Sequence, residues 1–92
     1  MATYPISIPR KSYQGSDPKK QRRVNEQNRI AAELEKYINA QIKDHGGGSY
    51  LYSSISYETG YDIETVRKLC FAIDCGHNGF TVAEPENNAD FR

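Results

Sequence analysis

Between residues 24 and 45 the apolar positions recur every three or four residues, as they do along one face of a helix. The residues that share this face are Ile30, Ala31, Leu34, Tyr37, Ile38 and Ile42. Asn25 is a plausible N-cap, and the three glycines at 46–48 end the pattern. The sequence therefore predicts a long amphipathic helix over residues 25–44.

Two shorter elements are predicted after the glycines. Residues 49–52 are rich in tyrosine and favour a short strand. Ser53 or Ser54 can then cap a brief helix that extends to Thr59, where Gly60 interrupts it.

A second short helix is predicted over residues 63–73, with Asp62 as its N-cap. Its apolar residues fall on one face at helical spacing: Val66, Leu69, Cys70 and Ile73. Residues 74–79 are typical of a turn, and residues 80–83 of a short strand.

Two short helices joined by three or four residues must cross at a steep angle. Gly60 supplies the backbone freedom that such a turn needs, and Ser56 is small enough for the point where the helices touch. Residues 52–70, YSSISYETGYDIETVRKLC, resemble the helix-turn-helix of bacterial and phage DNA-binding proteins. Ser56 stands where this motif usually has alanine, and Thr59 where it usually has an aliphatic residue.

With the longer helix in front and GHNGFTVA behind, residues 25–84 resemble a small winged helix-turn-helix domain. The resemblance implies a mostly helical α+β fold with a long first helix, a short strand, two short helices and a small β-wing. It also implies that helix 63–73 enters the major groove and that the wing lies on the DNA backbone. The residues expected to contact DNA are Glu64, Thr65, Arg67 and Lys68 on the helix, and His77 and Asn78 at the wing tip.

Charge divides the chain into two unequal parts. Residues 1–45 hold nine Lys/Arg against five Asp/Glu, and residues 46–92 hold three against seven. Three of the four prolines lie in residues 1–23, which we therefore expect to form a flexible basic arm. The arm residues expected on phosphates are Lys19, Lys20, Arg22 and Arg23. The domain is then expected over residues 24–84, followed by a flexible tail at 85–92.

The overall composition narrows the class of protein without assigning a function. Ninety-two residues suit one small domain, and the formal net charge is zero. We find neither a long apolar run nor the pattern of a secretory signal, and therefore expect a cytoplasmic protein.

A zinc site is the main chemical alternative, because Cys70, Cys75, His77 and His45 are all ligand types. The two cysteines are five positions apart and no second pair completes a tetrahedral site. A core cysteine and a turn cysteine explain them better. We also find no phosphate-binding loop and no acid–base pair, and so expect no cofactor, no metal and no enzyme.

The sequence thus predicts a small transcriptional regulator that binds specific duplex DNA. A winged-helix module that binds another protein instead of DNA is the alternative, because a fold does not fix a function. The apolar core is small for a stable monomer, so we also expect a homodimer through helix 25–44.

Overall fold

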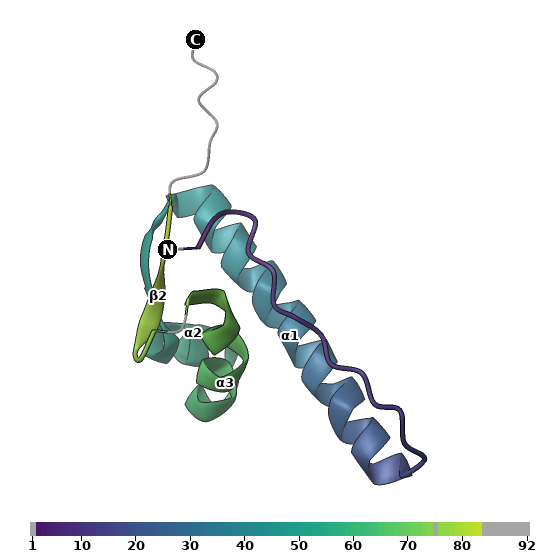
Figure 1. The fold of residues 1–92 in the computed structure, drawn as a ribbon. Coiled ribbons are helices and arrows are strands. Elements are labelled where there is room, and N and C mark those ends of the chain that lie inside the picture. Colours follow the sequence, from purple (N-terminus) through teal and green to yellow (C-terminus); the bar gives the residue numbers. More distant parts are fainter. Residues whose placement is uncertain (1, 75, 84–92) are drawn as a thin grey trace.

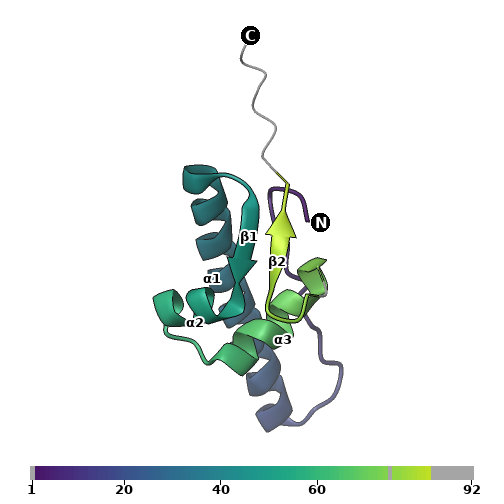
Figure 2. The ribbon, with the colours of Figure 1, turned by 90° about the vertical axis from the view of Figure 1, so that its left-hand side faces the viewer.

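The computed structural model describes residues 2–74 and 76–83. Within them, three helices and two strands follow one another as α1 (Pro18–His45), β1 (Gly48–Leu51), α2 (Tyr52–Thr59), α3 (Ile63–Asp74) and β2 (Gly79–Val82). The two strands form an antiparallel sheet, so the predicted mostly helical α+β class is confirmed. Helix α1 extends at its N-terminal end past α2 and α3 (Figure 1, Figure 2).

Helix α1 begins earlier than predicted, at Pro18 instead of residue 25. Its N-cap is Asp17, whose Oδ1 accepts a hydrogen bond from the backbone nitrogen of Lys19 at 2.9 Å. The proposal of Asn25 as N-cap was therefore wrong. An aspartate followed by proline is a favourable helix start, because proline fixes φ and needs no hydrogen-bond partner in the first turn.

Helix α2 begins at Tyr52 directly after β1, with Leu51 at the N-cap position and no side-chain cap. The predicted cap at Ser53 or Ser54 was therefore wrong. The backbone nitrogen of Tyr52 donates instead to the carbonyl oxygen of Asn78 at 2.8 Å, which satisfies one of the free amides of the first turn.

Strands β1 and β2 place Tyr50 opposite Phe80, and the two rings stack with their centroids 5.8 Å apart. On the other edge of β2, Ala2 forms a parallel bridge with Val82. Two backbone hydrogen bonds of 2.9 Å, one on each side of Ala2, hold this bridge. The start of the chain therefore extends the sheet.

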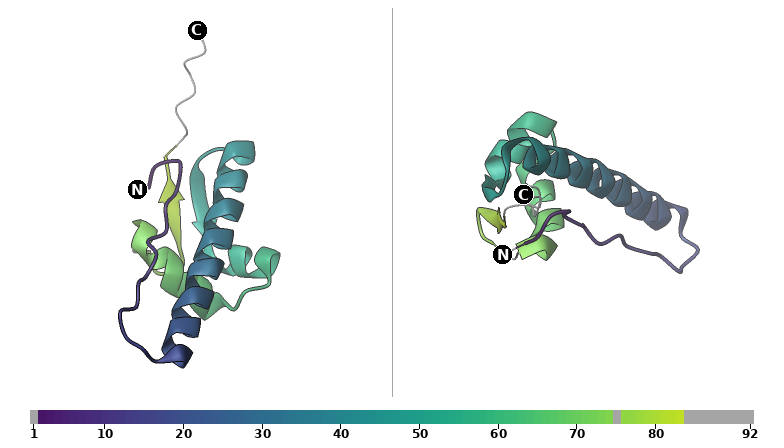
Figure 3. Two further views of the ribbon diagram at one scale, coloured as in Figure 1. Left: turned by 90° about the vertical axis from the view of Figure 1, so that its right-hand side faces the viewer. Right: turned by 90° about the horizontal axis from the view of Figure 1, so that it is seen from above.

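The flexible basic arm expected over residues 1–23 does not match the structure of the residues described. Residues 18–23 belong to α1, and residues 2–11, here called the N-terminal segment, lie along α1 (Figure 3). Ile6 and Ile8 of this segment are buried in the core. Their spacing of two positions, with Ser7 between them, suits an extended chain with one buried face.

Side chains of α1 hold the backbone of the N-terminal segment. Asn28 bonds both the nitrogen and the oxygen of Lys11, at 2.9 and 2.8 Å. Glu35 accepts from the backbone nitrogen of Ile8 at 2.8 Å. These side chains satisfy backbone groups that would otherwise need a neighbouring strand.

One apolar core joins these elements. Helix α1 contributes Ala31, Leu34, Ile38 and Ile42, and the remaining buried residues are Ala2, Ile6, Ile8, Tyr52, Ile55, Val66, Leu69, Cys70, Phe80 and Val82. Among the residues described, no helix combines the length and the apolar character that a membrane span requires. The predicted tail at 85–92 lies outside the described residues.

Candidate nucleic-acid interface

The turn between α2 and α3 is built around Gly60, which adopts the left-handed conformation with φ 82° and ψ 0°. Its backbone nitrogen donates to the carbonyl oxygen of Ser56 at 2.8 Å. Ser56 Oγ donates in turn to the carbonyl oxygen of Tyr61 at 2.6 Å. The Ser56 side chain therefore closes the turn.

Thr59 and Tyr61 fix this turn further. Thr59 Oγ1 donates to the carbonyl oxygen of Ile55 at 2.6 Å, as a helical threonine often does. The Tyr61 hydroxyl donates to Glu33 of α1, and this hydrogen bond raises the pKa of Tyr61. Glu33 also forms a 3.0 Å ion pair with Arg29. The turn is thereby attached to the long helix.

Helix α3 turns one face to the core and the other to solvent. The buried face carries Val66, Leu69 and Cys70. Asp62 caps the helix as predicted, since its Oδ2 accepts from the backbone nitrogen of Glu64 at 3.0 Å. Of the four α3 side chains expected to contact DNA, Thr65 is half-buried and three are exposed: Glu64, Arg67 and Lys68.

Glu64 and Arg67 form an ion pair one turn apart on α3. The hydrogen bond from the Arg67 guanidinium is the main cause that lowers the pKa of Glu64. The side chains of Arg67 and Glu64 are 47% and 69% exposed, so the pair contributes little stability. Arg67 can therefore leave Glu64 for a stronger acceptor at small cost.

The turn that follows α3 lies beside this ion pair. One surface hollow is lined by Leu51, Tyr52, Ser53, Ile63, Glu64, Arg67, His77 and Asn78. Two hydrogen bonds of Tyr52 hold the turn in place: its backbone nitrogen donates to Asn78, and its hydroxyl donates to the carbonyl oxygen of Gly76 at 2.9 Å. The structure thus brings four of the predicted site residues together.

His77 and Asn78 were expected at the tip of a hairpin, and the structure corrects this. They lie in the turn that joins α3 to β2, and β2 pairs with β1 and with Ala2. The proximity of His77 and Asn78 to α3 comes from this turn, since no hairpin follows α3 within the described residues.

A second hollow separates α3 from the first half of α1. Its lining residues are Gln27, Glu64, Thr65, Arg67, Lys68, Leu69 and Phe71. Gln27 and Phe71 were not among the predicted site residues. Phe71 follows Arg67 by four positions and Lys68 by three, so helical spacing alone places it beside them.

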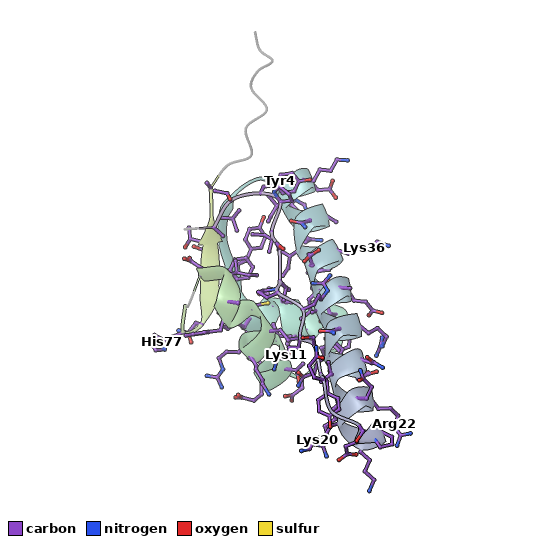
Figure 4. All side chains as sticks on the ribbon, turned by 45° about the vertical axis from the view of Figure 1, so that its right-hand side comes forward. Tyr4, Lys11, Lys20, Arg22, Lys36 and His77 are labelled. Atoms are coloured by element: carbon purple, nitrogen blue, oxygen red, sulfur yellow. The ribbon has the colours of Figure 1, made fainter. Side chains whose placement is uncertain are left out.

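The four basic residues expected to contact phosphates are exposed on the first turns of α1. They line neither of the two hollows beside α3. Lys20 and Arg22 project from the end of the helix, and His77 lies on the opposite side of the molecule (Figure 4). Arg23 precedes Gln27 by four residues and Lys20 precedes Arg23 by three. One face of α1 therefore leads from its basic end to the hollow beside α3.

Of the residues weighed for zinc, those that the structure describes are not gathered into a site. Cys70 is buried, and burial raises the pKa of its thiol to about 12. His45 lies exposed at the last position of α1. Within the part of the chain that the structure describes, no three His, Cys, Asp or Glu residues are placed to hold a metal ion. Cys75 lies outside the described residues.

Comparison of the chain with protein-family models, with curated proteins and with solved structures gives no match.

Proposed function

We propose that the protein binds duplex DNA as a small helix-turn-helix regulator, with α3 in the major groove. The observation that carries this proposal is the arrangement of α3 after the left-handed Gly60. Val66 and Leu69 face the core while Arg67 and Lys68 face outward. The Arg67 guanidinium can donate two hydrogen bonds to a guanine, and the Lys68 ammonium can donate to a guanine or a phosphate.

The order of the elements supports the same proposal. Strands β1 and β2 pair directly on either side of the α2–α3 unit in the chain, with Tyr50 opposite Phe80. The strand pair thus brings together the two ends of the segment that contains α2 and α3. His77 and Asn78, in the turn before β2, lie beside Arg67 and supply further donors for a phosphate or a base edge.

The charge distribution differs between α3 and the first turns of α1, and the two helices are expected to contribute differently to DNA binding. Asp62, which caps α3, and Glu64 offset the charges of Arg67 and Lys68, so this helix alone attracts DNA weakly. The basic end of α1 supplies the long-range attraction, since phosphate contacts carry most of the non-specific affinity. Its contributing residues are Lys19, Lys20, Arg22 and Arg23.

A protein-binding role is the second candidate, and exposed apolar side chains favour it. Leu51, Ile63 and Phe71 are each 43–49% exposed, and all three line the hollows beside α3. Apolar side chains at the centre of a surface are typical of protein interfaces.

The homodimer through helix 25–44 stays a prediction, and it has less support than the two candidate functions above. The described surface of α1 exposes no large apolar side chain, because its apolar residues face the core and the N-terminal segment. A dimer interface on this helix would be formed by polar groups such as Lys36 and Lys43.

Selection from random duplexes at moderate salt tests the proposal, with the full chain and its Arg67→Ala variant. We expect the wild type to enrich one motif. The variant should lose about 1–3 kcal/mol of binding free energy and accept other bases at one position. Lys36→Ala, which changes an exposed cation on α1 away from α3, is the control and should keep affinity and motif.

The opposite result is equally clear. If the wild type neither enriches a motif nor retains duplexes in a gel shift, DNA binding is excluded. A protein partner that is captured after nuclease treatment and lost with Phe71→Ala would then establish the second candidate.

A further inference from the structure

Two large apolar side chains flank Arg67 on the outward side of α3. Ile63 precedes Arg67 by four residues and Phe71 follows it by four, with exposed fractions of 43% and 48%. Residues four apart are neighbours on a helix surface, so the three side chains form one row. A row in which a cation separates two exposed apolar groups is unsuited to a continuous apolar interface.

Both hollows beside α3 meet at this row. Ile63 and Arg67 line the hollow that also contains His77, whereas Arg67 and Phe71 line the hollow that also contains Gln27. The row therefore forms a ridge between the two hollows. Such a ridge can insert into a groove of complementary shape.

We infer that Ile63 and Phe71 read thymine methyl groups on either side of the base that Arg67 contacts. The inference rests on the proposed DNA binding. The thymine methyl is the apolar group that a base pair presents in the major groove, and phenylalanine is among the side chains that contact it. Guanine offers Arg67 two acceptors in the same groove.

Helix geometry sets the spacing of the bases that are read. Four residues span roughly 6 Å along the helix axis, and successive bases of one strand are roughly 3.4 Å apart. Neighbouring side chains of the row thus meet bases about two steps apart. The target is a guanine with thymines within about two base pairs on both sides.

Deoxyuridine substitution tests this inference, because uracil pairs like thymine and lacks only the methyl group. Each thymine of the selected duplex is replaced in turn, and Kd is measured by gel shift with the wild type. We expect Kd to rise about three- to fivefold when uracil replaces a thymine beside the guanine that Arg67 contacts. This guanine is the one for which the Arg67→Ala variant has lost its preference. Uracil elsewhere in the duplex should leave Kd unchanged.

Variants assign each methyl group to a side chain. In Phe71→Ala, uracil at one of these thymines should cause no further loss, and Ile63→Ala should behave likewise at the other. Tyr57→Ala is the matched control, because Tyr57 is an exposed ring on α2 that lines neither hollow, and it should keep full sensitivity. Circular dichroism checks that each variant remains folded.

Three results would overturn the inference. If uracil is neutral at every position while the duplex still binds specifically, α3 reads no methyl group and the proposed function stands. If uracil sensitivity persists in both Ile63→Ala and Phe71→Ala, other residues read the methyl groups. If no duplex is selected at all, the proposed function fails together with the inference.

Discussion

The side chain of Asn39 makes two hydrogen bonds with the backbone of Ile6. Asn39 Oδ1 accepts from the nitrogen at 2.6 Å, and Asn39 Nδ2 donates to the carbonyl oxygen at 3.0 Å. An amide on α1 thus occupies the place that a neighbouring strand would take. Ile6 is thereby fixed with its side chain in the core, 3% exposed.

Asn39→Ala removes both of these hydrogen bonds and leaves partly buried backbone groups without their partner. We expect the free energy of unfolding to fall by about 1–3 kcal/mol, measured by urea denaturation. Lys36→Ala changes an exposed residue of the same helix and should stay within about 0.5 kcal/mol of the wild type. Equal values for the two variants would show that these two hydrogen bonds contribute no stability.

The contact between Glu35 and Ile8 makes stability depend on pH. The backbone nitrogen of Ile8 donates to the Glu35 carboxylate, Arg10 pairs with it at 3.2 Å, and these interactions lower the pKa of Glu35 below 4.5. The native state therefore binds this proton less readily than the unfolded state. The stabilisation is present above pH 4.5 and is lost as the pH falls through the lowered pKa.

Glu35→Gln removes the titrating charge and keeps a side-chain oxygen as acceptor. We expect the variant to have a lower Tm than the wild type at pH 7. The difference should narrow steadily as the pH falls below 4.5, when thermal unfolding is followed by circular dichroism. A difference that does not change with pH would exclude this contact as a source of pH dependence.

Gly60→Ala tests the turn on which the orientation of α3 depends. A Cβ at this position would meet no atom within 4 Å, so the cost lies in the left-handed backbone alone. We expect a loss of about 1–2 kcal/mol in the free energy of unfolding by urea. Gly60→Asn should cost less, because asparagine tolerates this conformation better. If both variants are as stable as the wild type, the glycine is not required.

The predictable parts of the fold were those specified by nearby residues. The cap at Asp62, the turn at Gly60 and the spacing of Val66 and Leu69 act within a dozen positions, and the structure agrees with the predicted α3. The outward direction of Arg67 follows from the same spacing. Local hydrogen bonds and helical periodicity suffice for such elements.

The N-terminal segment could not be predicted in this way. Two isoleucines among prolines give a weak local signal, and their burial depends on partners such as Asn39, 33 positions away from Ile6. The position of His77 likewise depends on hydrogen bonds from Tyr52 to Gly76 and Asn78, and Tyr52 begins α2, 24 positions before Gly76. The early start of α1 is different, because Asp17 and Pro18 form a local start signal. The number of prolines in residues 1–23 predicts a flexible arm instead.

The last prediction concerns the basic end of α1, which can be neutralised without disturbing the core. Deleting residues 1–23 would remove Ile6 and Ile8 from the core, so lost binding would be ambiguous. Replacing the four exposed cations by glutamine keeps a good helix former at every position: Lys19, Lys20, Arg22 and Arg23. We expect weaker binding to all duplexes and a slope of log K against log salt that is smaller by up to about four units.

The control for this variant is Lys36→Gln together with Lys43→Gln, which removes charge from the other half of α1. These changes should leave the salt slope unchanged, and neither set should alter the selected motif. The variant with four substitutions and Arg67→Ala then separate two contributions to binding. The four substitutions lower the affinity for every sequence, whereas Arg67→Ala lowers the preference among sequences. An unchanged salt slope in the variant with four substitutions would show that DNA does not reach this end of the helix, and binding would depend on α3 and the turn beside it.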